Sequence, residues 1–269
     1  MLVTDSSSYL APGLAAELGV RVVPLHVTLG DWSFDEPDVE PAEFYRRLRE
    51  QGGPPSTSQP SPGEFLRAFT AAAEAGADRV LCVTCTATMS GTYSSATLAA
   101  GMAPVPVDVV DSGTISGGLA LVVSTLGRAL RDGTAYDEVL AEARSMAGRV
   151  RSTWSSGSSA LLAAGGRLTD DVPDGIPVLA FDGTVRTLGA ARSVEESVAL
   201  QAEVVRAAAA TCPTRVSVGH GDVPEPADLL AAALAGAPGV LGIDRYVVGP
   251  VVGAHTGPGS FGANYLSGS

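Results

Sequence analysis

RVLCVTCTATMSGTYSSATLAA, residues 79–100, gives the clearest indication of the fold. Residues 79–85 form an apolar run rich in β-branched side chains and without in/out alternation, which is typical of a short parallel strand covered on both faces. From about Ser90 the apolar spacing becomes helical, with Ala96 and Ala99 on one side. A buried strand that leads into a helix is the building unit of a parallel α/β sheet, so this stretch predicts an α/β fold.

Three small residues, Ser90, Gly91 and Thr92, stand at the start of this predicted helix. Serine is a good N-cap, and glycine lets another group approach the backbone closely. The free amide groups of a helix start carry a partial positive charge, so a carboxylate or phosphate can dock there with help from the two hydroxyls. The alternative is that Ser90 only caps its own helix.

Two other predicted strands also end in small polar residues. Residues 2–4 lead into Asp5, and residues 107–110 lead into Asp111. In a doubly wound sheet the ligand lies outside the carboxyl ends of the strands. We therefore expect the strand ends at Asp5, Cys85 and Asp111 to converge on one binding crevice.

The length of the chain favours two domains, because 269 residues exceed what one hydrophobic core usually serves. We expect an N-terminal domain, residues 1–150, with a parallel sheet between helices, and a C-terminal domain, residues 151–269. Residues 176–180 and 184–188 predict a hairpin with an Asp-Gly turn. Antiparallel pairing, and thus a mixed sheet, is expected in the second domain.

The composition excludes several classes of function. The net charge is −12 and the pI is near 4.6, and no basic cluster with interleaved aromatics offsets this, so nucleic-acid binding is not expected. All 17 basic residues are arginine, which excludes a Schiff-base or P-loop lysine. No apolar run reaches the ~20 residues that span a bilayer, and no signal peptide precedes Met1, so we expect a cytoplasmic protein without an integral membrane segment. No cofactor and no metal site is expected.

Three stretches have a plain structural interpretation. Residues 20–29 are predicted to be one strand, with a proline inside it and His26 as a half-buried strand histidine. Residues 30–40 are acidic, and their spacing fits no Ca²⁺ loop, so a solvated loop is expected. Residues 240–252 are predicted to form two short strands with a break near Gly249.

Other stretches allow a functional interpretation. Residues 52–62 are too rich in proline and glycine for regular structure, so they form either a connector or a polar ligand loop. His255 lies among closely spaced glycines and, beside Thr256, can donate to an anion; the alternative is an incidental loop histidine. Residues 192–210 predict a long amphipathic helix whose polar residues, Gln201 among them, form an ordinary solvent-exposed face.

Taken together, several strings resemble the DegV family, in the family's order and at about its spacings. They are VTDSSSYL (3–10), VVPLHVTLGD (22–31), TSQPSPGEF (57–65), SGTYSSA (90–96), VVDSGTISGG (109–118), GGRL (165–168) and GAHTGPGSFG (253–262). The resemblance covers nearly the whole chain. It implies a fatty-acid-binding protein of two α/β domains with the lipid between them, which in firmicutes presents the acid to a fatty acid kinase that makes an acyl-phosphate.

Matched residue by residue, the resemblance also implies a binding site. The residues that it places around the lipid carboxylate or close to it are Thr57, Ser58, Ser90, Gly91, Thr92, Arg167, His255 and Thr256. Arg192 is similar to a family arginine implicated in docking the kinase. The segment between Gly166 and Asp182 is shorter than in the family, so a shorter pocket floor or lid is expected.

Two enzyme hypotheses stand beside this carrier hypothesis. In the first, Ser90 is a nucleophile, His255 its base and Asp5 or Asp111 the orienting acid of an acyl hydrolase or transferase; against it, Ser90 lies in T-M-S-G-T rather than in the G-x-S-x-G elbow. In the second, the chain transfers phosphate itself through His220 or His255, as dihydroxyacetone kinase subunits look like relatives of the fold. The chain has no glycine-rich phosphate loop with a lysine, which makes this hypothesis the weakest.

Overall fold

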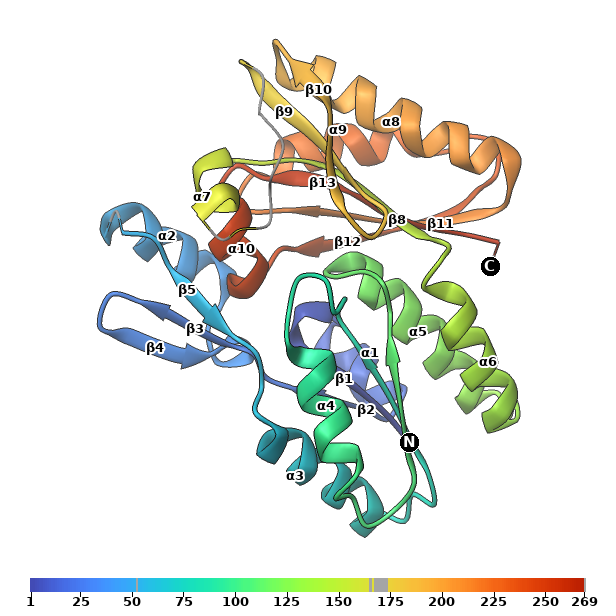
Figure 1. The fold of residues 1–269 in the computed structure, drawn as a ribbon. Coiled ribbons are helices and arrows are strands. Elements are labelled where there is room, and N and C mark those ends of the chain that lie inside the picture. Colours follow the sequence, from blue (N-terminus) through green and yellow to red (C-terminus); the bar gives the residue numbers. More distant parts are fainter. Residues whose placement is uncertain (52, 165, 167–173, 269) are drawn as a thin grey trace.

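The computed structural model describes residues 1–51, 53–164, 166 and 174–268. This part of the chain forms a four-stranded sheet, a six-stranded sheet and a three-stranded sheet. Figure 1 shows the two larger sheets in separate halves of the molecule, with the three-stranded sheet at one side of the junction between them. The predicted α/β fold with one parallel and one mixed sheet is confirmed.

The four-stranded sheet is parallel and has the strand order β2-β1-β6-β7. Its strands are β1 (Leu2–Asp5), β2 (Val20–Val23), β6 (Val80–Thr84) and β7 (Val107–Asp111). All of β6 is buried, as its apolar sequence predicts. A strand is buried in this way when helices cover both faces of its sheet.

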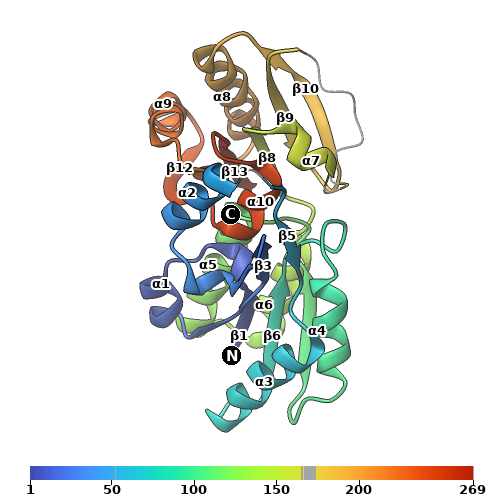
Figure 2. The ribbon, with the colours of Figure 1, turned by 90° about the vertical axis from the view of Figure 1, so that its left-hand side faces the viewer.

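Five helices provide that cover. They are α1 (Pro12–Glu17), α5 (Gly117–Arg131) and α6 (Tyr136–Met146) on one face, and α3 (Pro62–Glu74) and α4 (Thr92–Ala100) on the other. Because neighbouring residues of a strand point to opposite faces, Leu2 and Leu81 pack with the first group while Val3 and Cys82 pack with the second. Figure 2 shows α1 and α4 on opposite sides of β1 and β6.

The six-stranded sheet is mixed, with the order β10-β9-β8-β13-β11-β12. Its strands are β8 (Val150–Ser155), β9 (Ile176–Phe181), β10 (Val185–Ala191), β11 (Thr214–His220), β12 (Val240–Val247) and β13 (Phe261–Ser267). Only β11 and β12 pair in parallel; the other neighbours are antiparallel. The predicted hairpin is β9–β10. Helices α8 (Val194–Thr211) and α9 (Pro224–Leu234) pack on this sheet around Val216 and Val218.

The three-stranded sheet has the order β4-β3-β5 and lies beside the junction. Its elements and neighbours are β3 (His26–Leu29), β4 (Trp32–Asp35), the 3-10 turn η2 (Glu36–Asp38), α2 (Pro41–Gln51), β5 (Ser56–Ser58) and α10 (Pro250–Thr256). Val27 and Leu29 share a buried cluster with Phe44 of α2 and Val251 of α10. Thus α10, although it comes late in the chain, packs on N-terminal elements.

Three expectations for the N-terminal half were wrong. Residues 20–29 are two strands of different sheets, β2 and β3, because Pro24 cannot donate to the parallel ladder and the chain turns away there. Residues 30–40 are not a plain solvated loop, since they contain β4 and η2. Residues 52–62 include the short strand β5, which pairs with β3. His26 is half-buried on a strand, as predicted.

Three expectations for the C-terminal half also need correction. Residues 240–252 hold one strand, β12, and the segment after Gly249 is the start of helix α10. His255 therefore sits in the last turn of a helix and not in a loop. Gln201 is fully buried, and its amide nitrogen donates to Ser155 and Ser197, so this part of α8 does not face solvent.

The boundary between residues 150 and 151 remains a prediction. The parallel sheet uses strands between Leu2 and Asp111, and the six-stranded sheet uses strands between Val150 and Ser267. None of the helices in the described part of the chain has the length and apolar character that crossing a bilayer requires.

Candidate functional site

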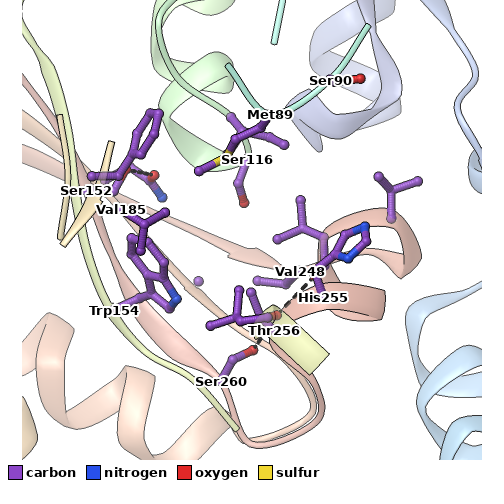
Figure 3. A pocket seen from close by; sticks show the side chains of 18 of the residues that line it. Met89, Ser90, Ser116, Ser152, Trp154, Val185, Val248, His255, Thr256 and Ser260 are labelled. Atoms are coloured by element: carbon purple, nitrogen blue, oxygen red, sulfur yellow. Dashed lines mark hydrogen bonds between the residues drawn. The ribbon is translucent and has the colours of Figure 1, made fainter. Parts of the chain in front are cut away.

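A cavity of about 220 Å³ lies where the two halves meet. One side is formed by residues that follow strands of the parallel sheet, among them Met89, Ser90 and Ser116. The other side is formed by β8, β13 and α10, with Trp154 and His255 (Figure 3). The carboxyl edge of a parallel sheet thus faces the cavity, as expected for an α/β protein.

One end of the cavity carries a group of small polar side chains. His255 Nε2 lies 2.9 Å from Thr57 Oγ1, which joins the last turn of α10 to strand β5. Ser58 and Gln59 continue this wall. Strand β5 is held by its pairing with β3, in which Thr57 lies opposite Val27. The polar ligand loop, one of the two interpretations of residues 52–62, agrees with this position.

Ser90 and Gly91 line the same cavity at the start of α4. The N-cap is Gly91 rather than Ser90, and the Ser90 hydroxyl lies 2.7 Å from Thr92 Oγ1. A Cβ on Gly91 would lie 2.8 Å from the Gln59 amide nitrogen, so the Gln59 side chain packs closely on the backbone of Gly91. Ser90 therefore presents a hydroxyl, and Gly91 its backbone, at the same end of the cavity.

The position of α10 is fixed by buried polar residues from the N-terminal half. The Glu36 carboxylate accepts from Val251 N at 2.8 Å and from the Ser6 hydroxyl at 2.6 Å. Tyr45 OH donates to Val248 O, and a Cβ on Gly253 would lie 2.5 Å from that Tyr45 oxygen. Burial raises the pKa of Glu36 to about 7, although the hydrogen bonds that its carboxylate accepts from Ser6 and Val251 act in the opposite direction. Glu36 was not among the predicted site residues, because nothing in the sequence distinguishes it from its acidic neighbours.

A chain of hydrogen bonds crosses another wall of the cavity. Ser116 Oγ and Tyr246 OH are 2.8 Å apart, Asn264 Nδ2 donates to the same Tyr246 oxygen at 3.0 Å, and Ser152 Oγ donates to Asn264 Oδ1 at 2.6 Å. Burial raises the pKa of Tyr246, so it stays a neutral phenol. These four side chains satisfy one another and link α5, β12, β13 and β8.

The remaining lining is largely apolar. The apolar side chains come from both halves of the molecule and include Leu25, Met89, Ile115, Trp154, Phe181 and Val185. The cavity therefore has a polar end suited to a small anion and walls suited to an apolar chain. No group of acidic, histidine or cysteine side chains that could hold a metal ion is found among the described residues.

The structure brings most of the predicted binding residues together. Those that line the cavity are Thr57, Ser58, Ser90, Gly91, His255 and Thr256. Thr92 is fully buried behind Ser90. Arg192 lies on the surface, with 92% of its side chain exposed and an ion pair to Glu196. Arg167 falls outside the described residues.

The strand ends at Asp5, Cys85 and Asp111 also lie close together, but their carboxylates organise turns. Asp5 is fully buried and accepts from the Cys85 backbone N–H at 2.7 Å and from Ser7 at 2.5 Å. Asp111 accepts from the backbone of Ala87 at 3.1 Å and of Gly113 at 2.8 Å. Burial raises the pKa of Asp5, although these bonds oppose the shift. The part of the crevice formed by these ends consists of Met89 to Gly91, Ile115 and Ser116.

The sequence comparison decides the family. A family model, described as an uncharacterised protein of the DegV family, matches residues 1–267. The chain belongs to the DegV family. A DegV domain-containing protein of Streptomyces coelicolor is 31% identical to it, over 97% of this chain and 96% of the relative.

Solved DegV structures have the same fold. A DegV family protein from Thermus thermophilus, described by its fatty acid binding, matches with a TM-score of 0.92 at 33% identity and covers 99% of both chains. A Thermotoga maritima protein, described as revealing a fatty acid binding function, matches with a TM-score of 0.88 at 26% identity, over 99% of this chain and 98% of its own. The two-domain DegV fold is therefore shared over nearly the full length.

Proposed function

We propose that this protein binds one long-chain fatty acid in the cavity between its two halves. The carboxylate lies at the end formed by Thr57, Ser58, Ser90 and His255, and the acyl chain lies along the apolar walls. The observation that carries the proposal is that small hydrogen-bonding groups from β5, α4 and α10 meet at one end of an otherwise apolar cavity. The fatty acid binding described for DegV relatives supports it.

The energetics explain how a chain with a net charge of −12 can bind an anion. Each buried CH₂ group stabilises the complex by roughly 0.8 kcal/mol, so a chain of about 16 carbons contributes about 11 kcal/mol before the cost of association. The start of α4 adds only about 0.3–2 kcal/mol for a carboxylate. The acyl chain therefore provides the affinity, and the polar end fixes the orientation.

We also propose that the protein is a carrier that presents the acid to a fatty acid kinase, in keeping with the family resemblance. Arg192 is exposed enough to contact such a partner. The carrier alone then makes no acyl-phosphate from ATP and fatty acid. In a reconstituted kinase assay, Arg192→Ala should slow acyl-phosphate formation and leave fatty acid affinity unchanged. Arg144→Ala, an exposed control on α6, should change neither the rate of acyl-phosphate formation nor the fatty acid affinity.

The hydrolase alternative finds little support in the hydrogen bonds of the site. Ser90 shares its hydroxyl with Thr92, and both acids proposed as orienting groups are engaged with backbone and serine partners. A triad requires an acid bound to the histidine and a histidine bound to the nucleophile. His255 Nε2 instead meets the hydroxyl of Thr57, which is not the proposed nucleophile, at 2.9 Å.

Titration of delipidated protein with palmitic acid and with methyl palmitate tests the binding proposal. The two ligands share an acyl chain, but the ester carries no charge. We expect one equivalent of palmitate to bind, and the ester to bind about tenfold or more weakly, because a hydrogen bond to a charged group contributes about 1.5–3 kcal/mol. Equal affinity for acid and ester, or no binding of either, would contradict the proposed site.

A further inference from the structure

Trp154 occupies a distinctive place in the cavity wall. It comes from β8, a central strand of the six-stranded sheet, and packs near Leu162, Leu179 and Val185. Figure 3 shows Ser152 and Trp154 projecting from the same side of β8, with the edge that carries the indole nitrogen turned toward the interior of the cavity. The ring is thus part of the surface that the acyl chain would contact.

The indole N–H of Trp154 is shielded from solvent and has no hydrogen-bond partner. The other polar groups of this region are paired: Ser152 with Asn264, and Thr256 with Ser260. The hydroxyl of Thr153 is also buried without a partner. Because side chains alternate along a strand, Thr153 lies on the same face of β8 as Ser155, whose hydroxyl bonds Ser197 of α8. Thr153 and Trp154 both line the cavity, and the indole of Trp154 has its nitrogen-bearing edge turned toward the interior.

An unpaired buried donor is unfavourable, because it has lost its hydrogen bonds to water without replacement. A water molecule in a cavity needs two to four polar partners. The side chains that share a hydrophobic cluster with the indole, Leu162, Leu179 and Val185, offer none. Two polar side chains of the same cavity, Thr256 and Ser260, already bond each other. A saturated acyl chain also offers no acceptor, so filling the cavity with such a chain leaves this donor unpaired.

We propose that the cavity prefers a fatty acid that carries an oxygen acceptor, a hydroxyl or keto group, part-way along its acyl chain, and that the Trp154 indole N–H donates to that oxygen. This inference rests on the proposed function and names the class of acid. Trp154 acts as a specificity residue, and the carboxylate end of the site is unchanged by it.

Competition binding with an isomer series tests the inference. The probes are stearic acid, hydroxystearic acids with the hydroxyl at successive positions, the matching ketostearic acids, and oleic acid. Since a neutral hydrogen bond contributes about 0.5–1.5 kcal/mol, we expect at least one oxygenated isomer to bind about three- to tenfold more tightly than stearate. In Trp154→Phe, which keeps an aromatic ring but removes the N–H together with the five-membered ring that carries it, the ratio of the two affinities should fall to about one, whatever the affinity for stearate itself.

Trp32→Phe is the matched control, because Trp32 is the other tryptophan of the chain and packs with Phe34 and Phe44 away from the cavity. It should keep the full ratio. Should Trp154→Phe fold poorly, the wild-type indole ¹H–¹⁵N signals serve instead: the Trp154 signal should move downfield with the preferred isomer and not with stearate.

Three outcomes would overturn the inference alone. The first is that no oxygenated isomer binds more tightly than stearate, and the second is that the affinity ratio of isomer to stearate is unchanged in Trp154→Phe. The third is that oleate binds as tightly as the preferred isomer, which would mean that the cavity selects the shape of the acyl chain rather than its oxygen. Failure of stearate and all isomers to bind would instead refute the proposed function, and this inference with it.

Discussion

The imidazole of His255 and the hydroxyl of Thr57 meet at 2.9 Å across a sequence separation of 198 residues. One residue ends a helix in the C-terminal part of the chain, and the other lies in the short strand β5 of the N-terminal part. Their contact closes the polar end of the cavity, so this end exists only when both halves are in place.

Thr57→Val should weaken fatty acid binding. The substitution keeps the branched shape and removes the hydroxyl that faces His255 and, in our proposal, the carboxylate. Loss of a hydrogen bond to a charged group costs about 1.5–3 kcal/mol, or about ten- to a hundredfold in Kd, as measured by calorimetry with palmitate. Thr28→Val on the adjacent strand β3, where the hydroxyl is exposed and bonds Ser33, is the control and should bind as wild type. An unchanged Kd for Thr57→Val would remove Thr57 from the site.

Glu36→Gln should change how stability depends on pH. The folded pKa of Glu36 is raised from 4.5 to about 7, so the folded state holds a proton that the unfolded state has lost between these values. The contribution of this carboxyl to stability is therefore full below about pH 4.5 and declines as the pH rises to about 7, by on the order of 3 kcal/mol. Glutamine has no such dependence. Relative to wild type, the variant should gain stability between pH 5 and pH 8 in urea denaturation.

The control for this experiment is Glu40→Gln, at an exposed position shortly after η2. Its stability relative to wild type should stay flat across the same pH range. A Glu36→Gln variant that is equally destabilised at pH 5 and pH 8 would show that Glu36 is ionised throughout and that burial does not shift its titration.

Gly219→Ala should destabilise the protein and disturb the cavity wall. A Cβ on Gly219 would lie 2.2 Å from Tyr246 Cζ, so the ring whose hydroxyl meets Ser116 and Asn264 must move. Overpacking of this kind costs about 1–3 kcal/mol. Gly242→Ala on the neighbouring strand has open space around it and should be close to neutral. Similar unfolding free energies for the two variants would mean that Tyr246 is free to move.

A fluorophosphonate probe should leave Ser90 unlabelled. The carrier proposal gives Ser90 a hydrogen-bonding role, and its hydroxyl is shared with Thr92 rather than activated by a base. The measurement is peptide mass spectrometry after incubation with the probe, with an active serine esterase in the same tube as a positive control. Stoichiometric labelling at Ser90 would favour the hydrolase alternative.

The elements that were predicted correctly carry local signals. The uninterrupted apolar run before Thr84 marks a strand covered on both faces, and the glycine and serines after it mark the turn at the cavity. The Asp-Gly pair between β9 and β10 marks a hairpin. The resemblance to the DegV strings points to individual positions, and most of the binding residues that it implies line the cavity.

The parts that were missed depend on tertiary partners. Val251 and Val252 favour a strand by intrinsic preference, yet they begin α10, because Glu36 accepts from the Val251 backbone N–H and Tyr9 accepts from that of Val252. Strand β13 contains Gly262, which has low strand preference, but a Cβ there would lie 2.4 Å from Trp154 Cβ, so packing against β8 requires glycine. No local pattern predicts contacts between residues so far apart.

Mass spectrometry of lipid extracted from the purified, denatured protein shows whether the cavity holds a fatty acid. We expect close to one long-chain fatty acid per wild-type chain, and much less in a Thr57→Val, His255→Ala double variant of equal folded content. Recovery of no acyl lipid, or of a ligand without a free carboxylate at the same stoichiometry, would contradict this expectation.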